Sequence, residues 1–81
     1  MKVQVKLYGL LRLRTKNYDS NKGVRIDIKK GALVKELLNG AGIDLQEVGC
    51  IFINGNNITN FEVHLEDGDI IKIFSRFPSG G

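Results

Sequence analysis

Only one stretch of this 81-residue chain shows the hydrophobic period of an α-helix, and this limits the folds open to it. Beyond residue 31, apolar residues recur three and four positions apart, which aligns them along one face of a short helix. We expect Gly31 to act as the N-cap and Gly40 or Gly42 to end the helix. A single helix can cover only one face of a sheet, which rules out a doubly wound fold. The predicted apolar stripe consists of Val34, Leu37, Leu38 and Ala41.

Alternating apolar and polar residues predict two strands before the helix. In residues 2–8 the apolar side chains fall on one face and the polar ones on the other, and residues 24–29 repeat the pattern. Residues 14–23 between them are polar and rich in turn formers. We therefore expect an antiparallel hairpin with a long loop. Four basic residues should share its solvent face: Lys2, Lys6, Arg25 and Lys29.

A short helical turn and a hairpin are predicted after the helix. Residues 44–47 resemble a capping box, which predicts one turn of helix. Residues 48–54 have the composition of a buried strand, and Asn54-Gly55 at its end is the strongest short hairpin signal in the sequence.

The last strand should lie inside the sheet. Residues 61–65 alternate weakly, which fits a short strand or an extended piece, and Gly68 can supply the positive φ of a tight turn. Residues 70–75 are apolar on both faces except for Lys72, which is typical of an interior strand.

These elements predict an α+β fold, with a mixed sheet of four to five strands and one main helix packed across one face. A chain of this length is enough for one small domain. We expect that domain to span residues 1–75, followed by a flexible Gly-Gly tail at residues 76–81.

The composition offers little chemistry of its own. One cysteine, Cys50, and one histidine, His64, cannot form a disulfide framework or complete a metal site together. We interpret Cys50 as a small buried residue and His64 as a surface residue. We therefore expect no intrinsic catalytic residue, no metal and no bound cofactor.

The chain shows neither a signal-peptide core nor a long apolar run, since its fully apolar runs have four residues or fewer. We expect a cytoplasmic protein with no membrane partner.

The formal net charge of +3 combines two opposite halves. Residues 1–35 carry ten Lys and Arg against two acids, a net charge of +8, and residues 36–81 carry two against seven, a net charge of −5. The basic half could face a nucleic acid or an acidic partner, but we interpret it as a solvated surface. Because the acidic half holds the last strand and the tail, we expect a docking partner with a basic surface.

The end of the chain is the candidate site. Glycines without side chains can thread a narrow channel and carry an α-carboxylate into a partner's active site. A carboxylate is a poor electrophile until it is activated, for example as an acyl adenylate, and this chain supplies no group for that step. A separate activating enzyme is therefore required. The activated residue would be Gly81, and the threading tail would be Arg76, Phe77, Pro78, Ser79 and Gly80.

A docking patch is expected next to the tail. Ile70 and Phe74 share one face of the last strand, opposite Ile71 and Ile73. If the second pair faces the helix, Ile70 and Phe74 form an apolar patch on which a partner can dock. The alternative is that the long first loop partly covers this side of the sheet.

Five segments together carry a resemblance to a known family: Leu7–Arg12, Val34–Leu38, Val48–Gly55, Leu65–Asp69 and Gly80-Gly81. In this order and spacing the chain resembles the MoaD/ThiS family of ubiquitin-like sulfur carriers over essentially its whole length. The resemblance implies a ubiquitin-like β-grasp fold whose first and last strands pair in parallel at the sheet centre.

The resemblance also implies a carrier and not an enzyme. An E1-like enzyme would use ATP to adenylate Gly81, and a sulfur donor such as a cysteine desulfurase or rhodanese would convert it to a thiocarboxylate. The long first loop favours molybdopterin biosynthesis, with a molybdopterin synthase large subunit as a further partner.

Three alternatives remain open. The short helix resembles the thiamine branch of the family, and a protein modifier joined to lysines would need the same Gly-Gly end. A small nucleic-acid-binding module ranks last, because Tyr8 and Tyr18 are the only aromatic residues in the basic half.

Overall fold

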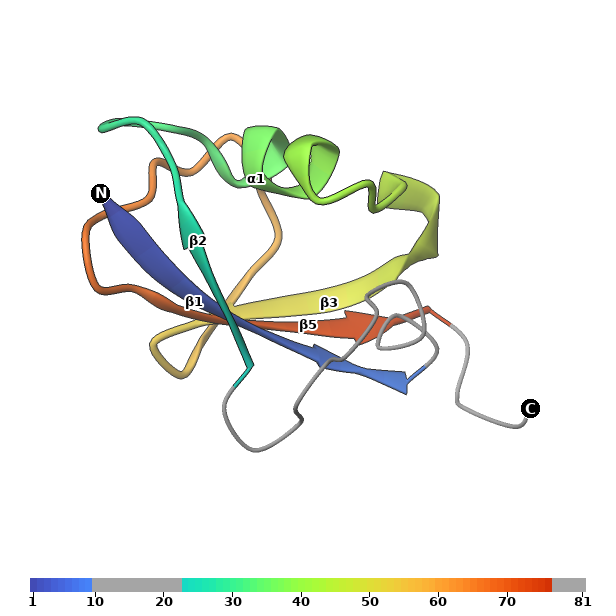
Figure 1. Cartoon of the computed structure of the whole chain (residues 1–81). Helices are drawn as coiled ribbons and strands as arrows, with labels where there is room; N and C mark the ends of the chain where they lie inside the picture. The colour runs from blue at the N-terminus through green and yellow to red at the C-terminus, as the bar shows by residue number, and fades with distance from the viewer. Residues whose placement is uncertain (10–22, 77–81) are drawn as a thin grey trace.

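The computed structural model describes residues 1–9 and 23–76. Within these residues a five-stranded sheet carries one α-helix on one face (Figure 1). The elements are β1 (Lys2–Tyr8), β2 (Val24–Asp27), α1 (Val34–Gly40), the 3-10 helix η2 (Leu45–Glu47), β3 (Val48–Ile53), β4 (Asn56–Ile58) and β5 (Ile70–Ser75).

The sheet is mixed. Its order is β2-β1-β5-β3-β4, in which β1 and β5 run parallel and the other neighbours are antiparallel. This arrangement confirms the expected α+β class and the β-grasp fold, including the parallel pairing of the first and last strands.

The core lies between α1 and the sheet. In the parallel register Val5 lies opposite Ile71 and Leu7 opposite Ile73, and both isoleucines are fully buried. Alternation in β1 and β5 turns these side chains toward the helix. The buried cluster consists of Val3, Val5, Leu7, Val34, Leu37, Leu38, Ile43, Val48, Ile51, Leu65, Ile71 and Ile73.

The start of α1 differs from the prediction. Gly31 has φ +81° and lies in the turn before the helix, and the N-cap residue is Leu33. The Leu33 N–H donates to Glu36 Oε1 at 3.1 Å, so a side chain from the first turn satisfies one of the unpaired amides. The expectation that Gly31 caps the helix is therefore wrong.

The end of α1 forms a Schellman motif. The helix ends at Gly40, as predicted, and Gly42 adopts φ +75°. The Ile43 N–H donates to the Leu38 carbonyl at 2.9 Å. The side chains of Ile43 and Leu38 are both buried, which is the apolar contact that accompanies this motif. Ala41, expected on the apolar stripe, is exposed at the C-cap because the chain reverses there.

The predicted hairpin of β1 and β2 is present, but β2 is shorter than expected. The ladder ends where Ile28 exchanges hydrogen bonds of 2.8 Å with Met1. Of the loop expected over residues 14–23, only Gly23 is among the described residues.

The turns of the second half follow the sequence signals. The Asp44 side chain caps η2, and Asn54 (φ 52°) and Gly55 (φ 86°) join β3 to β4. Asp69, which is 7% exposed, accepts a hydrogen bond of 2.9 Å from Asn54 Nδ2 and so ties this turn to the one at Gly68. Residues 61–65 form no strand: Phe61 and Glu62 lie in a turn, and His64 makes one isolated bridge with Leu33.

Substituting Leu38, which is completely buried, tests the packing of α1. Leu38→Ala should lower the free energy of unfolding by about 2–5 kcal/mol, because it leaves a cavity under the helix. The matched control is Leu45→Ala, since Leu45 is 46% exposed and should change stability by only about 0.5 kcal/mol. Urea denaturation measures both, and equal losses would contradict the described packing.

Candidate functional site

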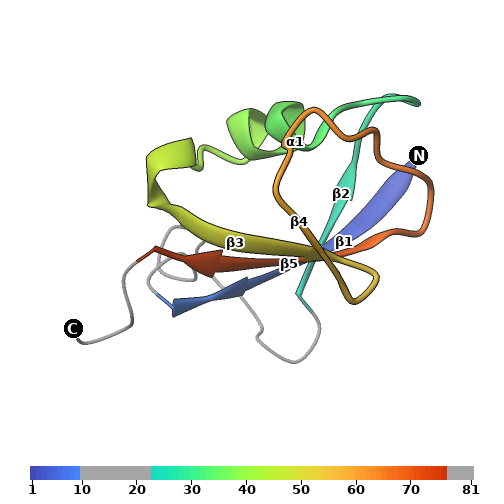
Figure 2. The same ribbon diagram turned by 180° about the vertical axis from the view of Figure 1, so that it is seen from behind.

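The base of the predicted tail is fixed to the sheet. Figure 2 shows β5 beside β3. Ser75 pairs with Val48 across these strands, and the Arg76 N–H donates to the Glu47 carbonyl at 2.7 Å. Arg76 is thus held through its backbone, while its side chain is exposed. The remaining predicted tail residues, Phe77, Pro78, Ser79, Gly80 and Gly81, lie outside the described residues.

Gly49 allows this close approach. The register shifts between Val48 and Cys50, and a Cβ on Gly49 would stand 2.8 Å from the Ser75 carbonyl oxygen and 3.1 Å from the Arg76 Cα. Sequence reasoning did not single out Gly49. The available signal was a glycine inside a strand pattern, which often marks a bulge or a close backbone contact.

Gly49→Ala should push the Ser75–Arg76 backbone away from β3. We expect a loss of roughly 1–3 kcal/mol in the free energy of unfolding, and faster hydrogen exchange of the Arg76 amide. Gly40→Ala is the control, because nothing lies within 4 Å of its added methyl group and it should be neutral or slightly stabilising. An unchanged Arg76 amide in Gly49→Ala would contradict this role.

The expected docking residues lie on the sheet face opposite α1. Ile70 is 39% exposed at the start of β5, and Phe74 is half-buried near its end. Phe74 stacks on Tyr8 with ring centroids 4.6 Å apart, and Phe52 meets it edge-on at 5.7 Å. We call Tyr8, Phe52 and Phe74 the aromatic cluster. Sequence reasoning missed its first two members, because only the strand order β1-β5-β3 brings them to Phe74.

The same face gathers positive charge. Lys6 lies opposite Lys72 across β1 and β5, and Arg25 and Lys2 continue the row on β2 and β1. We call Lys2, Lys6, Arg25 and Lys72 the basic face. Asp27, which pairs with Lys2 in the register, lies 3.5 Å from the N-terminal ammonium group.

Lys29 does not belong to this face. It was expected beside the other basic residues, but β2 ends at Asp27, and Lys29 Nζ lies 3.2 Å from Glu36 Oε2 of α1. The open face along β5 is therefore positive, because Lys72 adds to the cations of β1 and β2. The half of the chain that contains β5 has a net negative charge, and from that charge we expected a partner with a basic surface. The charge of the open face has the opposite sign.

Cys50 and His64 carry no site. Cys50 was expected to be buried, but it is half-buried because the register shift sets it opposite Phe74 on the open face. His64 is exposed, as expected, with Nδ1 2.8 Å from the Gly31 carbonyl oxygen.

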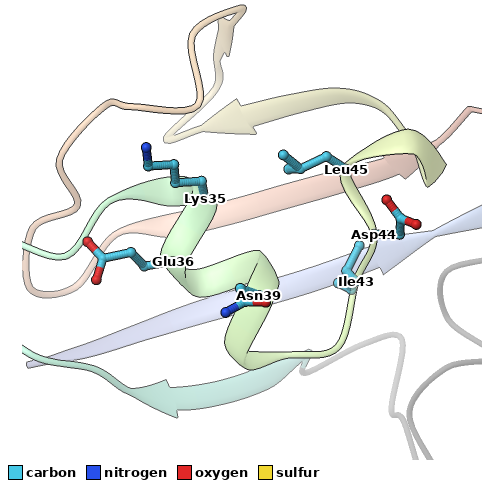
Figure 3. A pocket seen from close by; sticks show the side chains of 6 residues that line it. All are labelled: Lys35, Glu36, Asn39, Ile43, Asp44 and Leu45. Carbon is cyan, nitrogen blue, oxygen red and sulfur yellow. The ribbon is translucent and has the colours of Figure 1, made fainter.

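A shallow hollow of about 530 Å³ lies on the helix side of the molecule (Figure 3). Its charged groups are already engaged: Lys35 Nζ lies 3.0 Å from Glu62 Oε1, Glu36 binds Lys29, and Asp44 caps η2. We assign no chemistry to this hollow. Its lining residues are Lys35, Glu36, Asn39, Ile43, Asp44 and Leu45.

Among residues 1–9 and 23–76, no three metal-ligating side chains cluster together. None of the helices in this part of the chain is long and apolar enough to cross a membrane.

The carboxylate of Glu36 gives the stability a pH dependence. The Leu33 N–H, and after it Lys29, hold the pKa of Glu36 below its ordinary value of 4.5. Because the folded pKa is lowered, the stabilisation is present above pH 4.5 and is lost as pH falls through the folded value. Glu36→Gln should therefore melt at a lower temperature than the wild type near pH 7. The difference in melting temperature between Glu36→Gln and the wild type should shrink near pH 3. A difference that does not change with pH would contradict the role of the Glu36 charge.

The parallel β1–β5 centre, the antiparallel flanks and the single helix define a ubiquitin-like protein. The family model described as Mut7-C ubiquitin matches residues 1–79, and the chain belongs to this family. This agrees with the resemblance to small ubiquitin-like proteins of the MoaD/ThiS type. The match stops short of Gly80 and Gly81. No curated protein matches the chain.

Proposed function

We propose that this ubiquitin-like protein is a sulfur carrier whose Gly81 carboxylate is activated by an E1-like adenylating enzyme. The observation that carries the proposal is the fixed base of the tail. β5 is paired on both sides, and the hydrogen bond from Arg76 to Glu47, made possible by Gly49, fixes the backbone at the last described residue before Phe77. A tail that starts from a rigid base reaches a partner's active site at a smaller entropic cost.

The chemistry belongs to the partners. Attack of the Gly81 carboxylate on the α-phosphate of ATP forms an acyl adenylate and releases pyrophosphate. Sulfur from a persulfide donor, such as a cysteine desulfurase or rhodanese, then displaces AMP, and a thiol reductant cleaves the acyl disulfide to leave the thiocarboxylate. The carrier supplies the carboxylate, a thin tail and a docking surface, and it needs no cofactor of its own.

The aromatic cluster and Ile70 lie on the open face of the sheet, and Phe74 lies one residue before the end of β5. They offer apolar area on which the activating enzyme can dock. We place this reaction in the cytoplasm and the delivered sulfur in molybdopterin biosynthesis, with a synthase large subunit as the receiving partner. Thiamine biosynthesis and conjugation to lysines are the alternative uses of the same activated end.

Intact mass spectrometry of the protein, isolated from cells that contain its activating enzyme, tests the proposal. The expected result is replacement of one terminal oxygen by sulfur. Removal of Gly81 should abolish sulfur transfer without changing the circular dichroism spectrum, while Asn39→Ala, an exposed change on α1, should leave transfer intact.

Other masses overturn the proposal in different ways. Lysine-linked adducts would identify a modifier. A mature chain that extends beyond Gly81 would have no free carboxylate at this position, and normal sulfur delivery without Gly81 would exclude it as the reacting residue.

A further inference from the structure

The open face of the sheet combines stacked aromatic rings with lysines that form no ion pair among residues 1–9 and 23–76. Among the described residues no element packs against this face, since α1 and η2 lie on the other side (Figures 1 and 2). The aromatic cluster and the basic face are built from β1, β2, β3 and β5, so residues from both ends of the chain meet there.

The rings form a row across three neighbouring strands. Tyr8 and Phe74 stack with an interplanar angle of 11°, and Phe52 adjoins Phe74 at 78°. Tyr8 and Phe74 each cover one face of the other ring, but all three rings are only half-buried, so part of each remains exposed. Such rings are platforms on which bases stack, without a requirement for one base type.

The cations flank this row. Lys6 and Lys72 precede Tyr8 and Phe74 by two residues each, which is about 6.6 Å along the strands. The two lysines are direct cross-strand partners, and like charges in that position repel each other. No acid among the described residues forms an ion pair with either of them. A bound polyanion would relieve the repulsion.

The row of cations continues toward the other end of β1. Lys2 and Arg25 line a hollow of about 360 Å³ together with Asp67, whose carboxylate accepts the backbone N–H of Lys2 at 2.8 Å. Within the described part of the chain, the register of β1 and β2 adds one acid to the face, Asp27, which lies 3.5 Å from the N-terminal ammonium group. Positive charge therefore dominates from Lys72 to Arg25.

We propose that this face binds single-stranded nucleic acid, with bases on the aromatic cluster and phosphates on the basic face. This goes beyond the proposed sulfur chemistry and needs no activated Gly81. An acidic polypeptide would satisfy the charge but not the row of rings. The basic half of the sequence looks poor in stacking residues only because Phe52 and Phe74 come from the acidic half.

Fluorescence anisotropy of the full chain with labelled decauridylate, a single-stranded RNA of ten uridines, tests the stacking. The double variant Tyr8→Leu/Phe52→Leu keeps apolar bulk but removes two rings. It should weaken binding by roughly 5- to 150-fold for each stacked base. Phe61→Leu is the control, because Phe61 packs against the core away from this row and should leave affinity unchanged.

The charge is tested through the salt dependence. Lys6→Gln/Lys72→Gln should reduce the slope of log affinity against log salt by roughly 0.7 for each phosphate that a lysine no longer neutralises. The control Lys29→Gln/Lys35→Gln removes two lysines that form ion pairs on the helix side, and its slope should match the wild type.

Amide chemical shifts of the wild-type protein give a readout that needs no variant. Addition of decauridylate should shift residues of β1, β3 and β5 and leave α1 unchanged. Absence of binding, shifts centred on α1, or equal losses in the control variants overturn the proposal. Equal displacement by polyglutamate of the same charge would identify an acidic protein surface instead. Removal of Gly81 should leave RNA affinity unchanged, which separates this outcome from the sulfur-transfer test.

Discussion

The parallel pairing of β1 with β5 is the constraint on which the rest of the structure depends. It places the first and last strands together at the sheet centre, so one face of the pair buries Ile71 and Ile73 under α1. Side chains that alternate with the buried ones along β1 and β5 must therefore lie on the other face. This alternation, together with the parallel register, places Tyr8 beside Phe74 and Lys6 beside Lys72. A one-residue slip would expose the isoleucines and bury the lysines, so the core that stabilises the fold also fixes the composition of the open face.

Local signals in the sequence predicted most elements, because each depends on neighbours in the chain. The strands, the turn at Asn54-Gly55 and the cap of η2 are of this kind. The predicted N-cap of α1 was wrong because the capping side chain, Glu36, comes from inside the helix and reaches back to the Leu33 N–H, whereas the usual cap signal precedes the helix. Local signals could not predict the aromatic cluster or the role of Gly49, because both depend on which strands are neighbours in the sheet.

The two proposals concern adjacent parts of the molecule. Phe74 belongs to the aromatic cluster and is followed by Ser75, which contacts the strand near Gly49, so a ligand on the open face lies close to Arg76. An activating enzyme docked on Phe74 and a nucleic acid stacked on it would compete for the same rings. Ligand occupancy of the face would then lower the rate of activation without any change in the tail.

The net charge of each half of the sequence does not predict the charge of each face of the sheet. β1 and β2 come from the basic half, and β5, from the acidic half, adds Lys72 to the face that they form. Glu36 and Glu62, by contrast, pair with Lys29 and Lys35 on the helix side. The sheet therefore separates charge by face, and each strand contributes by alternation. A partner approaching along β5 meets cations although the surrounding sequence is acidic, and this is why the proposed partner of the open face is a polyanion.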